Sequence, residues 1–433
     1  MSETVSPAAP AVFGDYTPPA AVATNPATHK TSRVDSVDLL RGIVMVIMLL
    51  DHTRDFVHSQ ALQFDPTDMT RTYPALFFTR WITHFCAPIF VFLAGTGSYF
   101  QLMRGKSKRE LSRFLVTRGV WLIFLELTAV RIASFWTFNF QFLGAMQVIW
   151  ALGWSMIALG VLIHLRVRYI AAFGIGMIAL HNLTDTIRVA QWNGPESPVP
   201  SLLAKIWMTL HQGGAFPIAG WPSPVILMFY PLIPWIGVMA AGFAFGKVYE
   251  LEPEARRRWM MRWGTAITAG FVLLRLADFY GDPNGWGIQR SAAMTIASFL
   301  NTTKYPPSLL YLMMTLGPAI IALSYWERLN QPGSNEHGAL TRWLITYGRV
   351  PLFYYLLQWI VAHGAGYVLA IAADRNTAIF FSDVPPSTLP PKIGFDLWVV
   401  YACWIVGVLL LYPVCRWYAG VKARRRDWWL SYL

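Results

Sequence analysis

Ionisable residues lie at both ends of one apolar stretch, DLLRGIVMVIMLLDHTRDF, residues 38–56. Arg41 stands near its start, and Asp51, His52 and Asp55 stand near its end. On an α-helix Arg41 and His52 are almost three turns apart, so they share a face at a distance of ~16 Å. His52 and Asp55 are one turn apart, and a carboxylate there could fix the imidazole tautomer and raise its basicity. This spacing makes His52 a candidate general base.

The same charges also have a purely structural interpretation. Arg41 could extend to lipid headgroups, and Asp51 to Asp55 could mark the point where the helix leaves the membrane for water. Ionisable groups inside membrane spans are costly and are functional candidates by default. Spacing alone leaves both interpretations open.

A second histidine, His84, lies early in the next apolar segment, RWITHFCAPIFVFLAGTGSYF. Two histidines near one mouth of a helix bundle favour proton transfer more than either alone, although a single one is more often a packing residue. Glu126 and Arg131 lie in the third apolar segment and could pair with each other or with this cluster.

Two later segments carry further polar candidates. SFLNTTKYPPSLLYL brings Asn301, Lys304 and Tyr305 to the start of a span. YGRVPLFYYLLQW opens another span with Arg349, and His363 follows further along it.

The elements that carry these residues are predicted to be transmembrane helices. Of the 433 residues 55% are hydrophobic and only 13% are charged, whereas soluble chains carry roughly 25% charged residues. A hydrocarbon core of ~30 Å needs about 20 largely apolar helical residues. We therefore expect an all-α fold, a polytopic membrane bundle of about ten helices, near 37–57, 82–103, 113–134, 143–164, 169–183, 225–246, 263–281, 307–326, 350–373 and 396–419.

The loops between these spans sort by charge. The net charge of +12 does not by itself indicate nucleic acid, because the basic residues gather on one side of the predicted membrane. That side is expected to be cytoplasmic, with both termini inside, since cytoplasmic loops are enriched in Lys and Arg. The basic loops are RGKSKRELSR (104–113), RVR (166–168), EARRRWMMR (254–262) and VKARRR (421–426).

Three longer segments are then expected outside, at 58–81, 182–224 and 374–395. The second contains Trp192, Trp207 and His211. Such loops are long enough to cover a pore mouth or hold a substrate. Their aromatic residues could equally form a belt at the membrane interface.

The organisation of the chain follows from these spans. Residues 1–33, rich in Ala, Pro, Thr and Ser, are predicted to be a disordered cytoplasmic tail. Residues 34–420 form the transmembrane domain, and 421–433 form a basic and aromatic cytoplasmic tail. Gly242 and Gly246 make a GxxxG pattern that indicates close helix packing.

Other chemistries are poorly supported. Cys86, Cys403 and Cys415 lie in or beside apolar segments without CxxC spacing, so neither a disulfide framework nor a zinc site is predicted. The sequence contains no GxSxG elbow, no HExxH and no glycine-rich phosphate loop. We expect no metal.

Several blocks of this sequence resemble a known family. RVDSVDLLRGIVMVIMLLDH resembles the start of the catalytic domain of heparan-alpha-glucosaminide N-acetyltransferase and the first span of broader transmembrane acyltransferases, in which an RG pair precedes a His. Further blocks resemble the bacterial branch of that family and cover the chain from about residue 34 to its end: FCAPIFVFLAG, YPLIPWIGVMAAG, SFLNTTKYPPSLLYLMMTLGPA, YGRVPLFYYLL and CRWYAGVKARRRDWWLSYL.

The resemblance implies a multi-pass enzyme of the cell membrane, in bacteria the inner membrane. It would take an acyl group, usually acetyl, from cytoplasmic acyl-CoA and deliver it to a sugar or glycan hydroxyl or amine outside. The implied partners are membrane lipids, acyl-CoA and that acceptor, with no nucleic acid; a homodimer is one assembly left open.

The carry-over of the family's site residues is incomplete. Arg41 and His52 match the Arg and His of the broader acyltransferase pattern, whereas the heparan enzyme has Asn in place of His52. Its own catalytic histidine lies in a His-x-x-Trp-Asn motif of the first lumenal loop, which TRTYPALFFTRWITHFCAP (70–88) lacks. His84 falls in the corresponding block, where the heparan enzyme has an acid.

These observations lead to one mechanistic hypothesis. His52 acts as general base, Asp51 or Asp55 orients it, and His84 assists. The substrate or its oxyanion is bound by Arg80, Asn301, Lys304 and Tyr305. The CoA phosphates are bound by Arg41, Arg118 and Arg349. Direct transfer and an acyl-histidine intermediate both stay open. The alternatives are a transporter or flippase with a polar path, and a catalytically silent membrane scaffold.

Overall fold

The structure is a computed structural model that describes residues 34–60, 63–330, 338–381, 394–425 and 427–432. The predicted disordered tail, residues 1–33, lies outside the described residues. From Val34 onward the chain forms one compact unit, and that unit is mostly helical.

The helices follow one another along the chain with short connections. They are α1 (Asp35–Val57), α2 (Pro74–Ile82), α3 (Cys86–Met103), α4 (Lys108–Leu125), α5 (Arg131–Phe135), α6 (Val148–Leu162), α7 (Val167–Leu180), α8 (Leu202–Trp207), α9 (Leu232–Phe245), α10 (Pro253–Ala277), α11 (Ala292–Leu300), α12 (Leu309–Trp326), α13 (Ala339–Gly348), α14 (Pro351–Ala372) and α15 (Leu397–Arg424). The strands are β1 (Phe142–Met146), β2 (Gly214–Pro217) and β3 (Val225–Met228).

Five helical runs of the described chain are long and apolar enough to cross a membrane. They are Pro74–Met103, Leu232–Glu250, Leu309–Trp326, Pro351–Ala372 and Leu397–Arg424, and α6 is a shorter apolar helix. These runs indicate a multi-pass membrane protein. The count of about ten spans and the side of each loop stay predictions.

A small sheet replaces the starts of two expected spans, 143–164 and 225–246. Its strand order is β1-β3-β2, with β1 parallel and β2 antiparallel to β3. Gly144 has a φ of 147°, a value foreign to an α-helix, and Pro231 stands between β3 and α9. The fold is therefore mostly helical rather than purely α.

Several helices extend beyond their apolar cores. Pro74 begins α2, which continues through the 3₁₀ turn Thr83–Phe85 into α3 as one run of 30 residues, so the expected loop 58–81 ends in a helix. The basic stretch 254–262 opens α10 instead of forming a loop, and α15 continues through Arg424. Arg, Glu, Met and Lys are good helix formers, so a helix can continue into a charged stretch. Hydropathy alone therefore misplaces the ends of these helices along the sequence.

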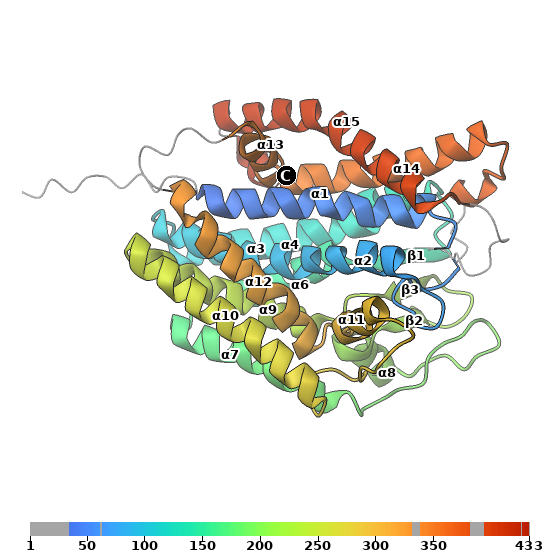
Figure 1. The fold of residues 1–433 in the computed structure, drawn as a ribbon, viewed down its shortest axis with the longest axis horizontal. Helices are drawn as coiled ribbons and strands as arrows, with labels where there is room; N and C mark the ends of the chain where they lie inside the picture. The colour runs from blue at the N-terminus through green and yellow to red at the C-terminus, as the bar shows by residue number, and fades with distance from the viewer. Residues whose placement is uncertain (1–33, 61–62, 331–337, 382–393, 426, 433) are drawn as a thin grey trace, which may run out of the picture. The chain divides into compact units, whose positions relative to one another are not determined.

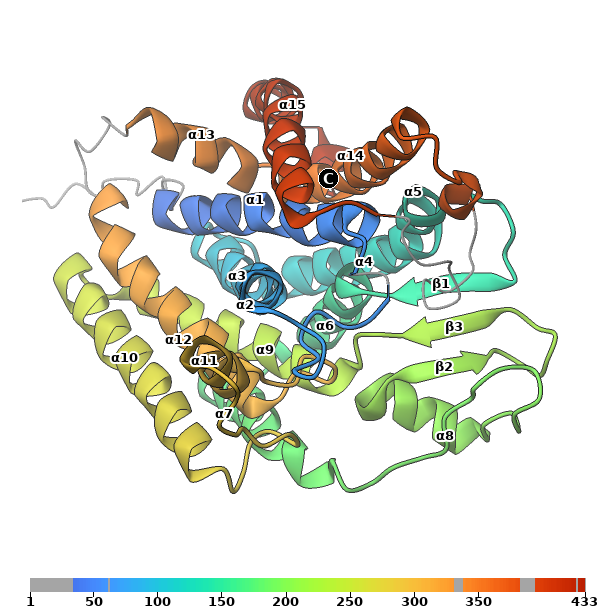
Figure 2. The same ribbon diagram turned by 45° about the vertical axis from the view of Figure 1, so that its right-hand side comes forward.

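The first helix has neighbours on both sides. In Figures 1 and 2, α1 lies between the group α13–α15 and the pair α3 and α12, and it contacts all of them. A Cβ atom at Gly42 would overlap the carbonyl of Leu344 in α13, and one at Gly348 would overlap the carbonyl of Asp38 in α1. The backbones of α1 and α13 therefore touch.

The predicted packing role of the GxxxG pattern is confirmed. A Cβ at Gly242 would overlap the carbonyl of Phe92, and one at Gly246 would overlap the Tyr99 side chain. Both glycines face α3, so their lack of a side chain lets the chain of α9 lie directly on α3.

Candidate active site at the end of α1

Asp51 is the centre of a buried ion-pair network, which we call the Asp51 cluster: Asp51, Arg54, Arg80, Thr83 and Lys304. Arg80 Nη1 donates to both carboxylate oxygens of Asp51, at 2.8 and 2.7 Å. Arg54 Nη1 lies 2.7 Å from Asp51 Oδ1, and Thr83 Oγ1 donates to the same oxygen at 2.9 Å. Lys304 Nζ lies 4.0 Å from Asp51 Oδ2. The network joins α1, α2 and the segment before α12.

Three cations thus surround one carboxylate, whose side chain is 14% exposed. Asp55 adds a second negative charge, 2.6 Å from Arg54 Nη2, but its side chain is 45% exposed. Lys304 is buried, and among the described residues its ammonium donates no hydrogen bond; its contacts are the Asp51 ion pair and the ring of Tyr305. An ammonium with unused donors in a buried network is suited to stabilise an anion or a developing oxyanion.

Both candidate histidines lie against this cluster. His52 and His84 are buried, and within the described chain the Nδ1 atom of each has no hydrogen-bond partner. The charges of Asp51 and Lys304 act on both imidazoles. The structure therefore brings the two histidines to one polar site, which their positions in the sequence did not establish.

Aromatic packing holds His52. Its ring lies 3.8 Å from the ring of Trp359 in α14, between centroids, at an interplanar angle of 39°. Among the described residues, no hydrogen bond joins Asp51 or Asp55 to the His52 ring. Asp51 accepts hydrogen bonds from Arg80 and Thr83 instead, and Asp55 accepts one from Arg54. Trp359 is thus the group that orients His52 here.

The stack continues along α14. His363, one turn beyond Trp359, stacks on Phe56 of α1 at 4.6 Å and on Trp136 at 4.2 Å. Its Nδ1 lies 3.2 Å from the carbonyl oxygen of Ala133. His363 therefore has a packing role in the wall beside the site.

His84 is held from the other side by α12. The hydroxyl of Tyr311 donates to the backbone carbonyl of His84 at 2.8 Å, and the two rings lie 5.4 Å apart. Tyr311 follows Ser308, whose side chain caps the start of α12 by accepting from the Tyr311 amide at 3.0 Å. The cap thus fixes the residue that positions His84.

Of the other residues expected to bind substrate, Tyr305 lies at the cluster. Its ring is 5.2 Å from the Lys304 ammonium, and it also packs against Phe229 at 5.6 Å and Tyr230 at 5.3 Å. Asn301 donates from Nδ2 to the carbonyl of Thr67 at 3.0 Å. Asn301 therefore ties the segment that carries Lys304 to the loop after α1.

Two residues proposed as possible partners of this cluster bond to backbone groups. Glu126 accepts from the amide of Trp150 at 3.1 Å. Arg131 donates to the carbonyls of Thr137 and Phe142, at 2.7 and 3.1 Å. Both hold the turns around β1 in place.

His58 immediately follows α1. Its Nδ1 accepts from the amide of Gln60 at 3.2 Å, and its Nε2 lies 3.4 Å from the hydroxyl of Tyr73. Burial, and then the positive charge of Arg54, lower the pKa of His58 to about 4. The imidazole is therefore neutral at physiological pH.

A second charged group, the Asp38 cluster, lies at the start of α1 and comprises Asp35, Asp38, Arg41 and Arg349. Arg41 lies 3.4 Å from Asp38 and donates to the carbonyl of Leu93 at 2.7 Å. Arg349 lies 3.4 Å from Asp35 and 3.9 Å from Asp38. Along α1 its member nearest to His52 is Arg41, which is almost three turns away, or ~16 Å.

Arg118 lies close to this end. It donates to the backbone carbonyl of Ser431, and the charge of Arg41 acts on it. The structure therefore brings the three arginines expected to bind CoA, Arg41, Arg118 and Arg349, to the same end of α1.

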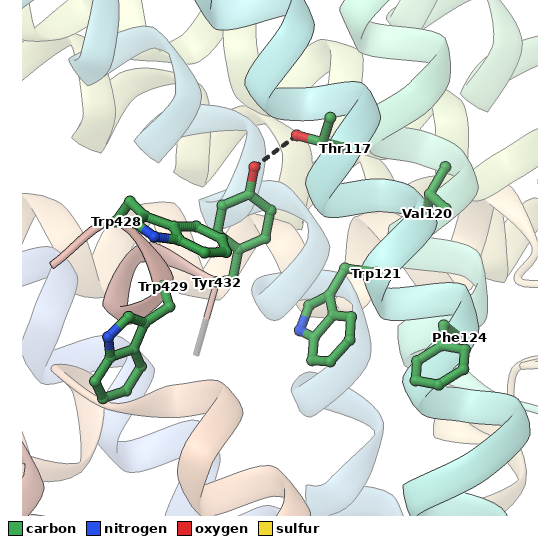
Figure 3. Close-up of a pocket in the computed structure, with 7 residues that line it drawn as sticks. All are labelled: Thr117, Val120, Trp121, Phe124, Trp428, Trp429 and Tyr432. Atoms are coloured by element: carbon green, nitrogen blue, oxygen red, sulfur yellow. Dashed lines mark hydrogen bonds between the residues drawn. The ribbon is translucent and has the colours of Figure 1, made fainter.

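An aromatic groove runs beside Arg118, between α4 and the C-terminal residues (Figure 3). Its volume is about 570 Å³, and it is lined by Thr117, Val120, Trp121, Phe124, Trp428, Trp429 and Tyr432. The Thr117 and Tyr432 hydroxyls lie 2.7 Å apart and join its two walls. The groove has no charged lining residue, so it does not suit the phosphates of CoA. It does show that the predicted C-terminal tail packs against α4.

Arg54, Trp359 and Tyr311 are site residues that the sequence analysis did not single out. The spacing of Arg54, one turn after Asp51, was a signal for an ion pair. Trp359 and Tyr311 reach the site from α14 and α12, and nothing in their local sequence separates them from other buried aromatic residues.

The fold and the site define a multi-pass helical membrane protein with two charged clusters on one helix. The family model described as heparan-alpha-glucosaminide N-acetyltransferase, catalytic, matches residues 33–278. The chain belongs to this family of acetyltransferases, whose donor is acetyl-CoA. No curated protein matches the chain.

The matched range covers only part of the site. It includes the Arg41, Asp51, His52, Arg80 and His84 positions and ends before Lys304 and Arg349. The later residues join the site through the tertiary structure.

Proposed function

We propose that the protein transfers an acetyl group from acyl-CoA, bound at the Asp38 cluster, to a sugar or glycan amine or hydroxyl at the Asp51 cluster, with His52 as the general base. The observation that carries this proposal is the Asp51 cluster itself. Within the described chain it places two buried imidazoles, whose Nδ1 atoms have no hydrogen-bond partner, beside the Lys304 ammonium, which donates no hydrogen bond and lies 4.0 Å from Asp51. Membership of an acetyltransferase family supplies the reaction class.

The chemical step balances with these groups. His52 removes the proton from the acceptor, the acceptor nitrogen or oxygen forms a bond to the acyl carbon, and the carbon–sulfur bond breaks. CoA leaves as a thiolate, and the proton held by the imidazole returns to the thiolate sulfur or to solvent. A general base contributes about 10²–10⁴-fold, and an oxyanion donor about 10²–10³-fold. Lys304 is the donor proposed here, with Arg80 beside it.

We propose for Asp51 a role other than the orientation of His52. Hydrogen-bonded to Arg80 and Thr83 and ion-paired with Arg54, it balances the cations that surround the site. We assign Asp51 to the positioning of Arg80 and Lys304, and the orientation of His52 to Trp359.

The sidedness of the reaction follows from the predicted topology. The basic loops would lie in the cytoplasm together with both termini and the Asp38 cluster, and the Asp51 cluster would face outside. The donor would then enter from the cytoplasm and the acceptor from the other side. The multi-pass location would be a bacterial inner membrane if the chain belongs to the bacterial branch.

The test compares His52→Ala, His84→Ala and a control, His164→Ala, which removes an exposed histidine. Purified protein receives acetyl-labelled acetyl-CoA and a panel of amino sugars and glycans. We expect His52→Ala to lose about 10²–10⁴-fold in transfer rate while it still binds acyl-CoA, and His84→Ala to lose less. Full turnover by His52→Ala would disprove the assignment, and a loss confined to His84→Ala would move the role to His84.

The same protein in sealed vesicles separates the competing classes. A transporter or flippase would carry the acceptor across the membrane without consuming acetyl-CoA, and a silent scaffold would do neither. Label that stays on the protein in the absence of acceptor would indicate an acyl-histidine intermediate instead of direct transfer.

A further inference from the structure

A second histidine-containing cluster lies away from α1, where the chain leaves α7. His181 begins the 3₁₀ turn that follows α7, and Asp185 comes directly after that turn. His211 lies in the π-helical turn Met208–Gln212 that follows α8, a rare kind of turn that is frequent at functional sites. Both histidines are buried, and the Asp185 side chain is 17% exposed.

The facing atoms of these three residues form a compact group. His181 Nδ1 lies 3.3 Å from His211 Nε2, and Asp185 Oδ1 lies 3.6 Å from the same nitrogen. All three ligand atoms lie within 4.8 Å of one another. For a tetrahedral ion with bonds of about 2.0–2.1 Å, neighbouring ligand atoms are about 3.3–3.4 Å apart. Two of the three distances between the ligand atoms, 3.3 and 3.6 Å, are close to that length.

Hydrogen bonds alone do not satisfy this arrangement. His211 Nε2 faces three electron-pair donors, namely His181 Nδ1, Asp185 Oδ1 and, at 3.2 Å, the carbonyl oxygen of His181. A single proton on His211 Nε2 can be directed well at only one of them, and the remaining lone pairs then face each other in a largely buried place. A bound cation would be attracted to all of them.

The surroundings hold these ligands in place. Asn182 Nδ2 donates to the second oxygen of Asp185 at 2.8 Å, and the ring of Trp207 stacks on His211 at 5.1 Å. Hydrogen bonds to a ligating carboxylate are the usual support of metal ligands. The partly exposed Asp185 side gives an ion a route from solvent.

We propose that His181, Asp185 and His211 form a binding site for a divalent transition metal ion of the Zn²⁺ class, with its remaining position open to water. Two imidazoles and a carboxylate suit this class of ion, whereas Mg²⁺ and Ca²⁺ prefer oxygen ligands alone. No metal was predicted from the sequence, because neither its cysteine spacing nor its local motifs indicated one. The ligands here are brought together by folding.

The site also has a structural consequence. The Asn182 side chain accepts from the amide of Leu309, the first residue of α12, at 2.9 Å. The segment immediately before this point carries Lys304 and Tyr305. An ion at the site would therefore fix the segment after α7 against the start of α12, near the residues that reach the Asp51 cluster.

The experiment measures metal binding directly and does not depend on acetyl transfer. Full-length protein with a histidine-free affinity tag is stripped with a chelator, dialysed against Zn²⁺ and analysed for bound metal. We expect one Zn²⁺ per chain, and in a parallel sample Co²⁺ should give the visible absorption of a four-coordinate ion. His164→Ala, which removes an exposed histidine, is the matched control and should bind as the unmodified protein does.

Three variants test the ligands. His211→Ala should abolish stoichiometric binding, and Asp185→Asn, which keeps the size of the side chain, should lose both the ion and the Co²⁺ spectrum. Asn182→Ala should weaken binding about 10–100-fold, as loss of a supporting hydrogen bond does. If His211→Ala fails to fold, Asp185→Asn decides. No bound ion in the unmodified protein, or equal binding by Asp185→Asn, would overturn the proposal in favour of a hydrogen-bonded histidine pair.

Discussion

At the scale of single residues, Lys304 is the most informative group of the site. Lys304 is buried, and its ammonium lies 4.0 Å from Asp51 and, among the described residues, donates no hydrogen bond. Its donors are therefore available to an anion that binds beside the cluster. The proposed acyl transfer supplies such a charge in the developing oxyanion.

Replacing Lys304 tests this role. Lys304→Met keeps much of the length and removes the charge, so we expect kcat to fall about 10²–10³-fold with a small change in KM, because the interaction is made in the transition state. Steady-state acetyl transfer measures both constants. Lys247→Met, at an exposed position, is the control. An equal rise in KM with unchanged kcat would instead assign Lys304 to ground-state binding.

His58 gives a prediction for the dependence of stability on pH. Its pKa in the folded protein is lowered to about 4 by burial and by Arg54, against an ordinary value of about 6.5. The unfolded chain therefore binds the proton more readily between these values. The stability that His58 contributes is complete above about pH 6.5 and is lost as the pH falls towards about 4.

Thermal unfolding at pH 7.5 and pH 5 measures this effect. The decrease in melting temperature at the lower pH should be smaller in His58→Gln than in the unmodified protein. His164→Gln, at an exposed site, should behave like the unmodified protein. If the melting temperature of His58→Gln falls as much as that of His164→Gln, then His58 does not couple proton binding to unfolding.

At the scale of elements, the contact between α1 and α13 positions the Asp38 cluster. The backbones touch at Gly42 and Gly348, where any side chain would overlap a carbonyl group of the other helix. Arg349 directly follows Gly348 and reaches Asp35 and Asp38 from there. The glycines therefore set the distance over which these ion pairs form.

Gly348→Ala should destabilise the protein by about 1–3 kcal/mol, the usual cost of overpacking. Gly176→Ala is the matched control, since a Cβ in that helix meets open space and alanine favours a helix by up to about 1 kcal/mol. Unfolding in detergent, followed by circular dichroism, compares the two. Equal stability of both variants would mean that α13 moves away from α1 without cost.

At the scale of the whole molecule, α1 connects two charged clusters that the proposed reaction uses differently. The Asp38 cluster would bind the donor and the Asp51 cluster the acceptor, and Asp38 and Asp51 are ~20 Å apart along the helix. A substitution at one end should then affect one substrate.

Arg349→Gln tests this separation. We expect it to raise KM for acetyl-CoA several-fold, because one phosphate contact is lost, and to leave KM for the acceptor nearly unchanged. Arg342→Gln, in the same helix region but outside the cluster, is the control. A change in acceptor KM alone would contradict the assignment of the donor to this end.

The sequence by itself determined what depends on local patterns. Long apolar runs predicted the membrane helices, because helix formation and hydropathy are read within about 20 residues. The two charged ends of α1 and the shared face of Arg41 and His52 followed from helical spacing alone. The GxxxG pattern predicted a close helix contact, whose partner α3 came only from the structure, and the family resemblance predicted the acetyltransferase class.

Only the tertiary structure decided which distant residues meet. Lys304 reaches Asp51, Trp359 packs against His52, and His211 reaches His181, each from a helix or turn far along the chain. The small sheet in place of two helix starts was equally invisible to hydropathy, because apolar residues suit either structure. These contacts depend on how whole helices pack, and packing is decided by many side chains together and not by the spacing of any few.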